Sequence, residues 1–304
     1  MNWNLLVRFQ SFFSISDVNS TLEALLAENC SDSEDIDTVD VDNNKNSDDD
    51  DEIDNGPTVQ AHVELAQTVR EFILLIHGIC SKVVLSEHKC NLADLAGEIN
   101  QPRLPEHIRR FLYDQLYPDS HLTSADVSLN ACPIFSGIVS VFSSAVATYH
   151  APSDPSGIGG MRRERIRAVP SWRLGAARYD CAFVDSRPDL QGMCGLDVVR
   201  ILLLFSFTFE NVTYPCALVH WFTLVEEEPD SDTGMWMVQP EITDDGLPVL
   251  SVIHLDCIFR AAHLLPIYGD DPIPITITPD NSLDAFAAFY VNKYADHHAF
   301  EIAS

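Results

Sequence analysis

Two long apolar runs on either side of a short polar segment constrain the fold of this chain more than any other feature. Val198–Phe209 and Tyr214–Val225 flank the segment Glu210–Thr213. In the second run, Leu218, His220 and Phe222 alternate with Val219, Trp221 and Thr223. Neighbouring side chains of a strand point to opposite faces, so this run suits a strand, and the polar segment suits a turn. The sequence therefore predicts a β-hairpin.

Further short apolar runs surround this hairpin. They predict strands at Tyr179–Val184, Gly234–Gln239, Val249–Leu255 and Leu264–Tyr268. A short helix is expected over Cys257–His263, capped by Asp256, and a last helix over Ser282–Tyr290, capped by Ser282. Many short strands in close succession are typical of small barrels. Residues 181–304 are thus expected to form a small antiparallel β-barrel-like or curled-sheet module with a terminal helix.

The region before this module, residues 59–180, is predicted to be mainly helical, which makes the fold class α+β. Near-helical spacing is seen first at Val63, Leu65, Val69, Phe72, Ile73 and Ile76, and after Pro105 at Ile108, Phe111, Leu112 and Leu116. Phe135–Val146 fits either a strand followed by a helix or one buried helix. The glycines of Ser153–Gly160 indicate a loop, which leads into a segment rich in arginine.

The N-terminal residues have a different composition. Residues 1–29 are expected to be a short helix or unstructured. Residues 30–55 contain twelve acidic residues and one lysine. Such a sequence cannot bury enough apolar surface to offset the entropy lost on ordering. Residues 30–58 are therefore predicted to be an acidic disordered linker.

Composition also bounds the location and the partners of this chain. The net charge of −28 argues against uniform attraction to nucleic acid or to anionic membranes. The eight cysteines include no Cys-x-x-Cys pair, which argues against zinc ribbons and favours buried thiols in a reducing compartment. No secretory signal and no apolar run near the roughly 20 residues of a membrane span are found. An intracellular protein that does not enter the membrane is expected.

The arginine-rich segment is the best lead to function. Six of the 18 basic residues of the chain fall within residues 162–178, with Trp172 among them; these are Arg162, Arg163, Arg165, Arg167, Arg173 and Arg178. Guanidinium groups bind phosphate in a bidentate manner, and aromatic rings stack on exposed bases. We expect these seven residues to contact nucleic acid. The alternative is that the arginines pair with nearby acids, such as Glu164 and Asp180.

Nine stretches resemble the C-terminal region of fungal transposon proteins of the Plavaka type, within the KDZ-like elements. In chain order they are Leu112–Asp119, Ala151–Arg167, Pro170–Arg173, Arg178–Cys181, Ala217–Phe222, Asp232–Trp236, Val252–Asp256, Phe289–Tyr294 and Asp296–Ala303. The resemblance covers about Leu92 to Ser304. The resemblance implies that the acidic catalytic triad of such proteins lies in a domain upstream of this segment. It implies a non-catalytic accessory region that is no enzyme by itself, and a nuclear location.

Other functions remain open at this stage. An exposed Trp221 or Trp236 would suit a chromatin-reader or other protein-interaction module, although aromatic residues at this spacing belong more often to a core. A transposon relic without selected function is a further alternative. Two histidine groups, His254 with Asp256 and His263, and His297 and His298 with Asp296 and Glu301, offer metal-ligand types without a diagnostic spacing. The sequence predicts no metal, no cofactor and no catalytic residue.

Overall fold

The computed structural model describes residues 62–65, 71–76, 79–84, 88–153, 159–173, 175–268, 272–273, 275–278 and 280–304. For residues 62–65, 71–76, 79–84 and 88 only the backbone is described. All of these residues belong to one compact unit that includes 59–304. The helix expected within residues 1–29 and the acidic linker 30–58 lie outside the described residues.

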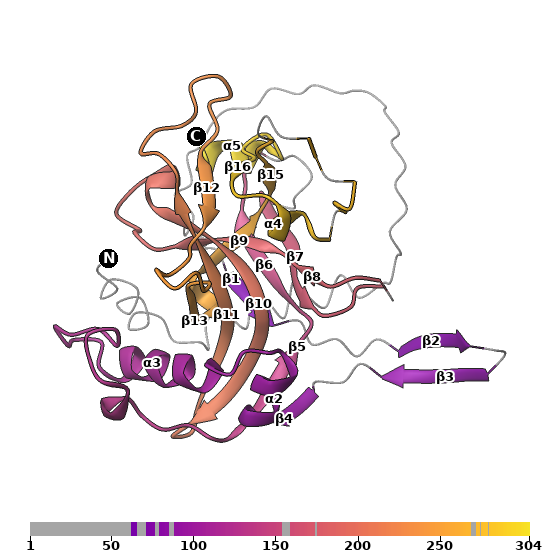
Figure 1. Cartoon of the computed structure of the whole chain (residues 1–304), viewed down its shortest axis with the longest axis vertical. Coiled ribbons are helices and arrows are strands. Elements are labelled where there is room, and N and C mark those ends of the chain that lie inside the picture. Colours follow the sequence, from indigo (N-terminus) through magenta and orange to yellow (C-terminus); the bar gives the residue numbers. More distant parts are fainter. Residues whose placement is uncertain are drawn as a thin grey trace, which may run out of the picture. The chain divides into compact units, whose positions relative to one another are not determined.

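The predicted hairpin is the centre of the fold (Figure 1). Strand β10 (Leu196–Phe209) pairs antiparallel with β11 (Val212–Leu224) along nearly its whole length. The turn is shorter than expected, since only Glu210 and Asn211 lie between the strands, with φ of 49° and 66°. Positive φ at both central residues is the geometry of a type I′ turn, whose twist matches that of paired strands. The hairpin predicted from the sequence is therefore confirmed.

A large, curled antiparallel sheet is built outward from this hairpin. One side of β10 pairs with β9 and β5, and β5 pairs with β4. On the other side, β11 pairs with β12 and β13. The bounds of the added strands are β4 (His88–Asn91), β5 (Ile138–Phe142), β9 (Cys181–Asp185), β12 (Met237–Pro240), β13 (Leu250–His254), β14 (Ile258–Ala262), β15 (Leu264–Pro266) and β16 (Phe289–Val291). The curled-sheet prediction is thus correct.

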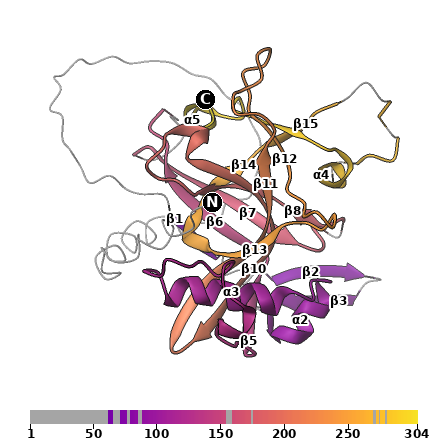
Figure 2. The ribbon, with the colours of Figure 1, turned by 60° about the vertical axis from the view of Figure 1, so that its left-hand side comes forward.

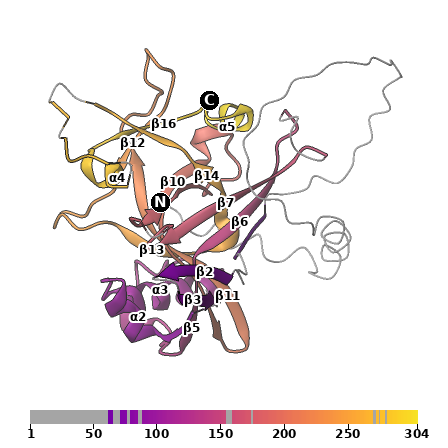
Figure 3. The ribbon, with the colours of Figure 1, turned by 90° about the vertical axis from the view of Figure 1, so that its right-hand side faces the viewer.

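A second, smaller sheet carries the arginine-rich segment. Its four strands lie in the order β1 (His62–Leu65), β6 (Ser144–His150), β7 (Met161–Val169) and β8 (Arg178–Tyr179). Figure 3 shows β6 and β7 as neighbouring antiparallel strands. A separate two-stranded pair joins β2 (Glu71–Ile76) to β3 (Ile79–Val84).

Four α-helices accompany the sheets in the described part of the chain: α2 (Leu92–Glu98), α3 (Leu104–Leu116), α4 (Ser282–Ala285) and α5 (His297–Ile302). Pro105 opens α3, and Ile108, Phe111 and Leu112 are buried, as their spacing predicts. Figure 2 shows α3 beside β13.

The core has two layers, one on each face of the β10–β11 hairpin. Between the two sheets lies a cluster that contains Ile166 of β7, Val199 and Leu204 of β10, and Trp221 of β11. The opposite face packs against α2 and α3 at one end and against the C-terminal elements at the other. A bulge between Ile201 and Leu203 shifts the alternation of β10 by one residue. Val199 and Leu204 can therefore face the same layer although their separation is odd.

The prediction of a mainly helical region over 59–180 is wrong. Residues 62–65, 71–76 and 79–84 are strands, and Phe135–Val146 yields β5 and the start of β6 instead of a helix. Short apolar runs fit the strand and helix periods almost equally, and pairing with a neighbouring strand decides between them. The expected boundary at residue 180 is absent too, because β5, from the first region, pairs with β10, from the second.

Two predicted helices near the C-terminus are corrected in the same way. Cys257–His263 is mostly strand β14, preceded by a 3₁₀ turn at Leu255–Cys257. Helix α4 ends at Ala285, and Phe289 begins β16. Ile258, Phe289 and Val291 are fully or almost fully buried between neighbouring strands. Burial on a sheet has therefore overridden the local helical pattern.

Gly195, just before β10, has no room for a side chain. A Cβ atom at this position would lie 2.5 Å from the carbonyl oxygen of Leu190 and 3.0 Å from that of Arg187. The carbonyl of Gly195 also accepts hydrogen bonds from the backbone N–H groups of Ser186 and Arg187. Gly195→Ala is expected to lower the free energy of unfolding by about 2–3 kcal/mol, measured by denaturant titration.

Gly97→Ala is the matched control for this prediction. Gly97 lies within α2, and a Cβ added there meets no atom within 4 Å. Alanine is a better helix former than glycine, so this variant is expected to gain about 0.5–1 kcal/mol. If Gly195→Ala were as stable as the parent protein, the turn before β10 would have more freedom than the contacts of Gly195 indicate.

Candidate nucleic-acid interface

The strand β7 sorts the predicted arginines onto two faces. Arg163, Arg165 and Arg167 occupy alternate positions, while Ile166 and Ala168 between and after them are buried in the core. Side chains two residues apart on a strand share a face, with a separation of about 7 Å. These three guanidinium groups therefore line the face of β7 that points away from the core.

Trp172 gathers a second group of arginines. The loop between β7 and β8 carries Trp172 and Arg173, and Arg178 begins β8. The guanidinium carbons of Arg167, Arg173 and Arg178 lie 4.5, 5.4 and 5.6 Å from the centroid of the Trp172 ring. All three distances are within the range of cation–π attraction. We call Arg163, Arg165, Arg167, Trp172, Arg173 and Arg178 together the arginine surface.

Acidic groups compensate this surface only in part. Arg178 donates from Nε to Asp180 Oδ1 at 2.7 Å, and the other carboxylate oxygen accepts from the backbone N–H of Arg167. Within the described residues, Arg163, Arg165, Arg167 and Arg173 form no ion pair. Burial lowers the pKa of Arg167, and the charge of Arg178 lowers it further. The surface therefore keeps an excess of positive charge on a strongly acidic protein.

Arg162 does not belong to the arginine surface. It alternates with Arg163 along β7 and lies opposite Tyr149 of β6 in the strand register. The alternative is that the arginines pair with nearby acids such as Glu164 and Asp180. This holds for Arg178, which pairs with Asp180. Glu164 pairs instead with Arg260, which lies outside the segment. Of the seven predicted residues, the structure brings six together and separates Arg162 from them.

A buried ionic cluster near the C-terminus was not predicted from the sequence. Arg260 of β14 is only 4% exposed, and its guanidinium donates to both carboxylate oxygens of Asp296 and to Glu164. Its guanidinium carbon lies 4.7 Å from the ring centroid of Tyr149, and His298 stacks on the same ring at 4.8 Å. We call these five residues the Arg260 cluster. Its members come from four separate elements, so no local pattern could have revealed it.

The electrostatics of the Arg260 cluster follow from burial and pairing. Hydrogen bonds from Arg260 lower the pKa of Asp296 to about 2. Burial raises the pKa of Glu164, and the charge of Arg260 acts against this rise. Burial lowers the pKa of His298, and the charge of Arg260 lowers it further. Asp296 also caps α5 by accepting from the N–H of Ala299. The cluster therefore fastens the C-terminal helix to β7 and β14.

The two histidine groups considered for metal binding have other contacts. The Nδ1 atom of His254 accepts from the backbone N–H of Asp256, Nδ1 of His263 lies 3.1 Å from the amide nitrogen of Asn292, and His298 belongs to the Arg260 cluster. No arrangement of three or more metal-ligating side chains is found among the residues that the structure describes.

The two tryptophans considered for a reader pocket are part of the core. Trp221 and Trp236 are each 7% exposed. The indole N–H of Trp221 donates to the hydroxyl of Ser251 at 2.6 Å. Because both rings are buried, neither is available to line the exposed pocket that a chromatin-reader module would need.

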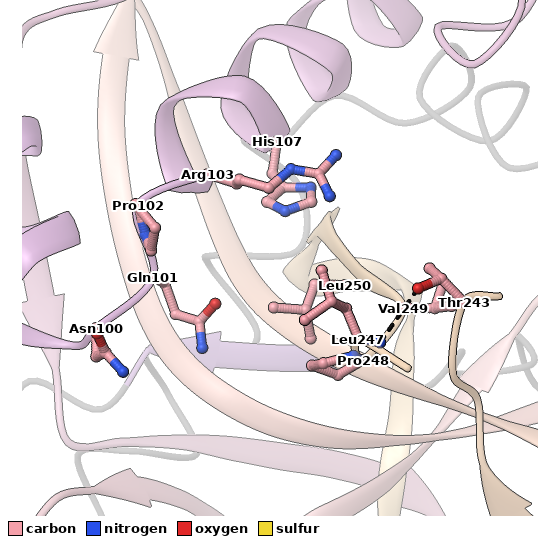
Figure 4. A pocket seen from close by; sticks show the side chains of 10 residues that line it. All are labelled: Asn100, Gln101, Pro102, Arg103, His107, Thr243, Leu247, Pro248, Val249 and Leu250. Atoms are coloured by element: carbon pink, nitrogen blue, oxygen red, sulfur yellow. Dashed lines mark hydrogen bonds between the residues drawn. The ribbon is translucent and has the colours of Figure 1, made fainter. Parts of the chain in front are cut away.

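A shallow groove of about 400 Å³ lies away from the arginine surface, between the start of α3 and the loop before β13 (Figure 4). Gln101, Arg103 and His107 line one side, and Leu247 to Leu250 the other. Burial lowers the pKa of His107, and the charge of Arg103 adds to this effect. The lining offers apolar contact and a few polar groups but no carboxylate or thiol.

Comparison with protein-family models, curated proteins and solved structures found no match to this chain. Among the described residues, no helix is both long and apolar enough to cross a bilayer. A functional proposal must therefore be based on the chemistry of the residues themselves.

Proposed function

We propose that this chain is the non-catalytic accessory region of a transposon-derived protein, and that its arginine surface contacts the phosphate backbone of nucleic acid. The proposal is carried by one observation: six predicted residues lie on one surface, and four of its arginines form no ion pair with any residue that the structure describes. Arginines that served only to balance nearby acids would be expected to alternate with carboxylates on that surface. The same proposal implies a nuclear location.

The net charge of the chain makes a local surface necessary. The net charge of −28 disfavours association with nucleic acid overall, and at physiological ionic strength salt screens this repulsion beyond a Debye length of about 8 Å. Contact therefore depends on guanidinium groups that reach the phosphates directly. Such contacts release counterions, and binding then weakens steeply as salt is added.

The test is a triple variant in the full-length chain, Arg163→Ala with Arg165→Ala and Arg173→Ala. These side chains are exposed and form no ion pair within the described residues, so the fold should tolerate their loss. On double-stranded DNA at low salt, the variant is expected to bind roughly a hundredfold more weakly, and the slope of log K against log salt should flatten by about 2–3. Fluorescence anisotropy across a salt titration measures both.

A second triple variant controls for the change in net charge: Lys89→Ala with Arg103→Ala and Arg187→Ala. These residues are exposed and lie on other elements, and the charge lost is the same. The control should bind with nearly the parent slope. Equal effects of both variants would show that only overall charge matters and would contradict the proposal, as would a parent chain that binds no DNA at low salt.

A further inference from the structure

The three guanidinium groups around Trp172 differ from the alternating arginines of β7. Arg163 and Arg165 are spread along a strand, whereas Arg167, Arg173 and Arg178 converge on a single ring. Their only carboxylate partner within the described residues is Asp180. A single compact anion could therefore be approached by several of these arginines at once. The three arginines and Trp172 are called the Trp172 site below.

The loop between β7 and β8 holds the Trp172 site in place. The backbone N–H of Trp172 donates to the carbonyl of Ala176 at 2.9 Å, and the N–H of Gly175 donates to the carbonyl of Trp172 at 2.8 Å. Arg173, at the tip, has a φ of 51°. This left-handed conformation costs a non-glycine residue about 1–2 kcal/mol. The strained backbone places an exposed arginine beside the ring before any ligand is bound.

The hydrogen-bonding capacity of the Trp172 site is also incompletely used. The Nε atom of Arg167 is buried and has no hydrogen-bond partner among the described residues. Arg173 forms no hydrogen bond or ion pair within the described part of the chain. A phosphate monoester carries a charge of about −1.5 to −2 at neutral pH and has three terminal acceptor oxygens. A backbone phosphodiester offers less charge and fewer such oxygens, so it matches three converging guanidinium groups less well.

We propose that Arg167, Trp172, Arg173 and Arg178 form a binding site for a phosphate monoester, specifically for the phosphorylated 5′ end of a nucleic-acid strand. The inference rests on the proposed function, since Arg163 and Arg165 would then follow the phosphodiester backbone that leads away from this end. The end of the strand lies at Trp172, and its next phosphates lie along β7.

The experiment compares two oligonucleotides of one sequence, one with a 5′-phosphate and one with a 5′-hydroxyl, labelled at the 3′ end. Anisotropy with the full-length chain is expected to show about tenfold tighter binding of the phosphorylated strand, the effect of one well-placed charge-assisted contact. Arg173→Ala should bring this ratio to about 1. The matched double variant Arg163→Ala with Arg165→Ala should weaken both strands and leave the ratio unchanged.

Each other outcome overturns a stated part of the inference. Equal binding of both strands, still dependent on Arg163 and Arg165, overturns the Trp172 site and leaves the proposed function intact. Tighter binding of a phosphoserine peptide than of the phosphorylated strand overturns the assignment to nucleic-acid ends. If neither strand binds, the proposed function fails. Inorganic phosphate is then titrated while the Nε–H resonances of the arginines are followed by NMR, and no shift at Arg173 overturns the site.

Discussion

Arg260→Met is expected to lower the free energy of unfolding by about 3–5 kcal/mol, because it leaves two partly buried carboxylates without their cationic partner. Methionine fills a similar volume but removes the charge that faces Glu164 and Asp296. Both carboxylates would then be left without their cationic partner in a site where Arg260 itself is 4% exposed. Equilibrium denaturant unfolding measures the loss.

A combined variant tests whether the loss comes from uncompensated charge. Adding Glu164→Gln and Asp296→Asn to Arg260→Met removes both carboxylates, while the new amide oxygens can still accept from Ala261 and Ala299. A neutral cluster should regain a large part of the lost stability. If the triple variant were less stable than Arg260→Met alone, lost packing would explain the effect better than lost pairing.

The effect of Arg260→Met should depend on pH in a defined direction. Pairing with Arg260 lowers the pKa of Asp296 from an ordinary 3.8 to about 2. A depressed carboxyl pKa stabilises the folded state above the ordinary value, and this contribution is lost as the pH falls through the folded value. The burial-raised pKa of Glu164 acts in the opposite sense and does not add to acid lability. The difference between parent and variant should therefore shrink between about pH 4 and pH 2.

Phe111→Ala is expected to have an effect of the same size, a loss of about 3–5 kcal/mol. Phe111 of α3 is 5% exposed, and its ring meets Phe207 and Tyr214 of the central hairpin edge-on, at centroid distances of 6.2 and 5.8 Å. Truncation would leave a cavity between helix and sheet that the rigid strands cannot close. The same denaturant titration measures this loss.

Tyr117→Ala gives a size-matched comparison on the same helix. Tyr117 follows the last residue of α3 and is 52% exposed. Its removal is expected to change stability by less than about 1 kcal/mol. If both variants lost the same amount, α3 would contribute through its helical order rather than through the contact of Phe111 with the hairpin.

Several elements could be predicted from local patterns. The apolar run around Leu218 and Val219 became strand β11, and the stripe Ile108, Phe111 and Leu112 follows a proline that starts the helix. The shorter runs at 71–76 and 79–84 fit two periods equally well, and these became paired strands instead of a helix. Spacing alone therefore did not distinguish helix from strand, whereas the proline at the start of α3 did.

The sequence by itself determined that six arginines are concentrated around Trp172, that a long hairpin turns within Glu210–Thr213, and that α3 has one apolar face. Only the tertiary structure decided that Arg162 faces away from the other arginines and that Arg260 forms ion pairs with Glu164 and Asp296. The physical reason is the range of the interactions. Turn conformation and side-chain alternation act between near neighbours in the chain, whereas burial and ion pairing join residues that meet only when distant strands pack together.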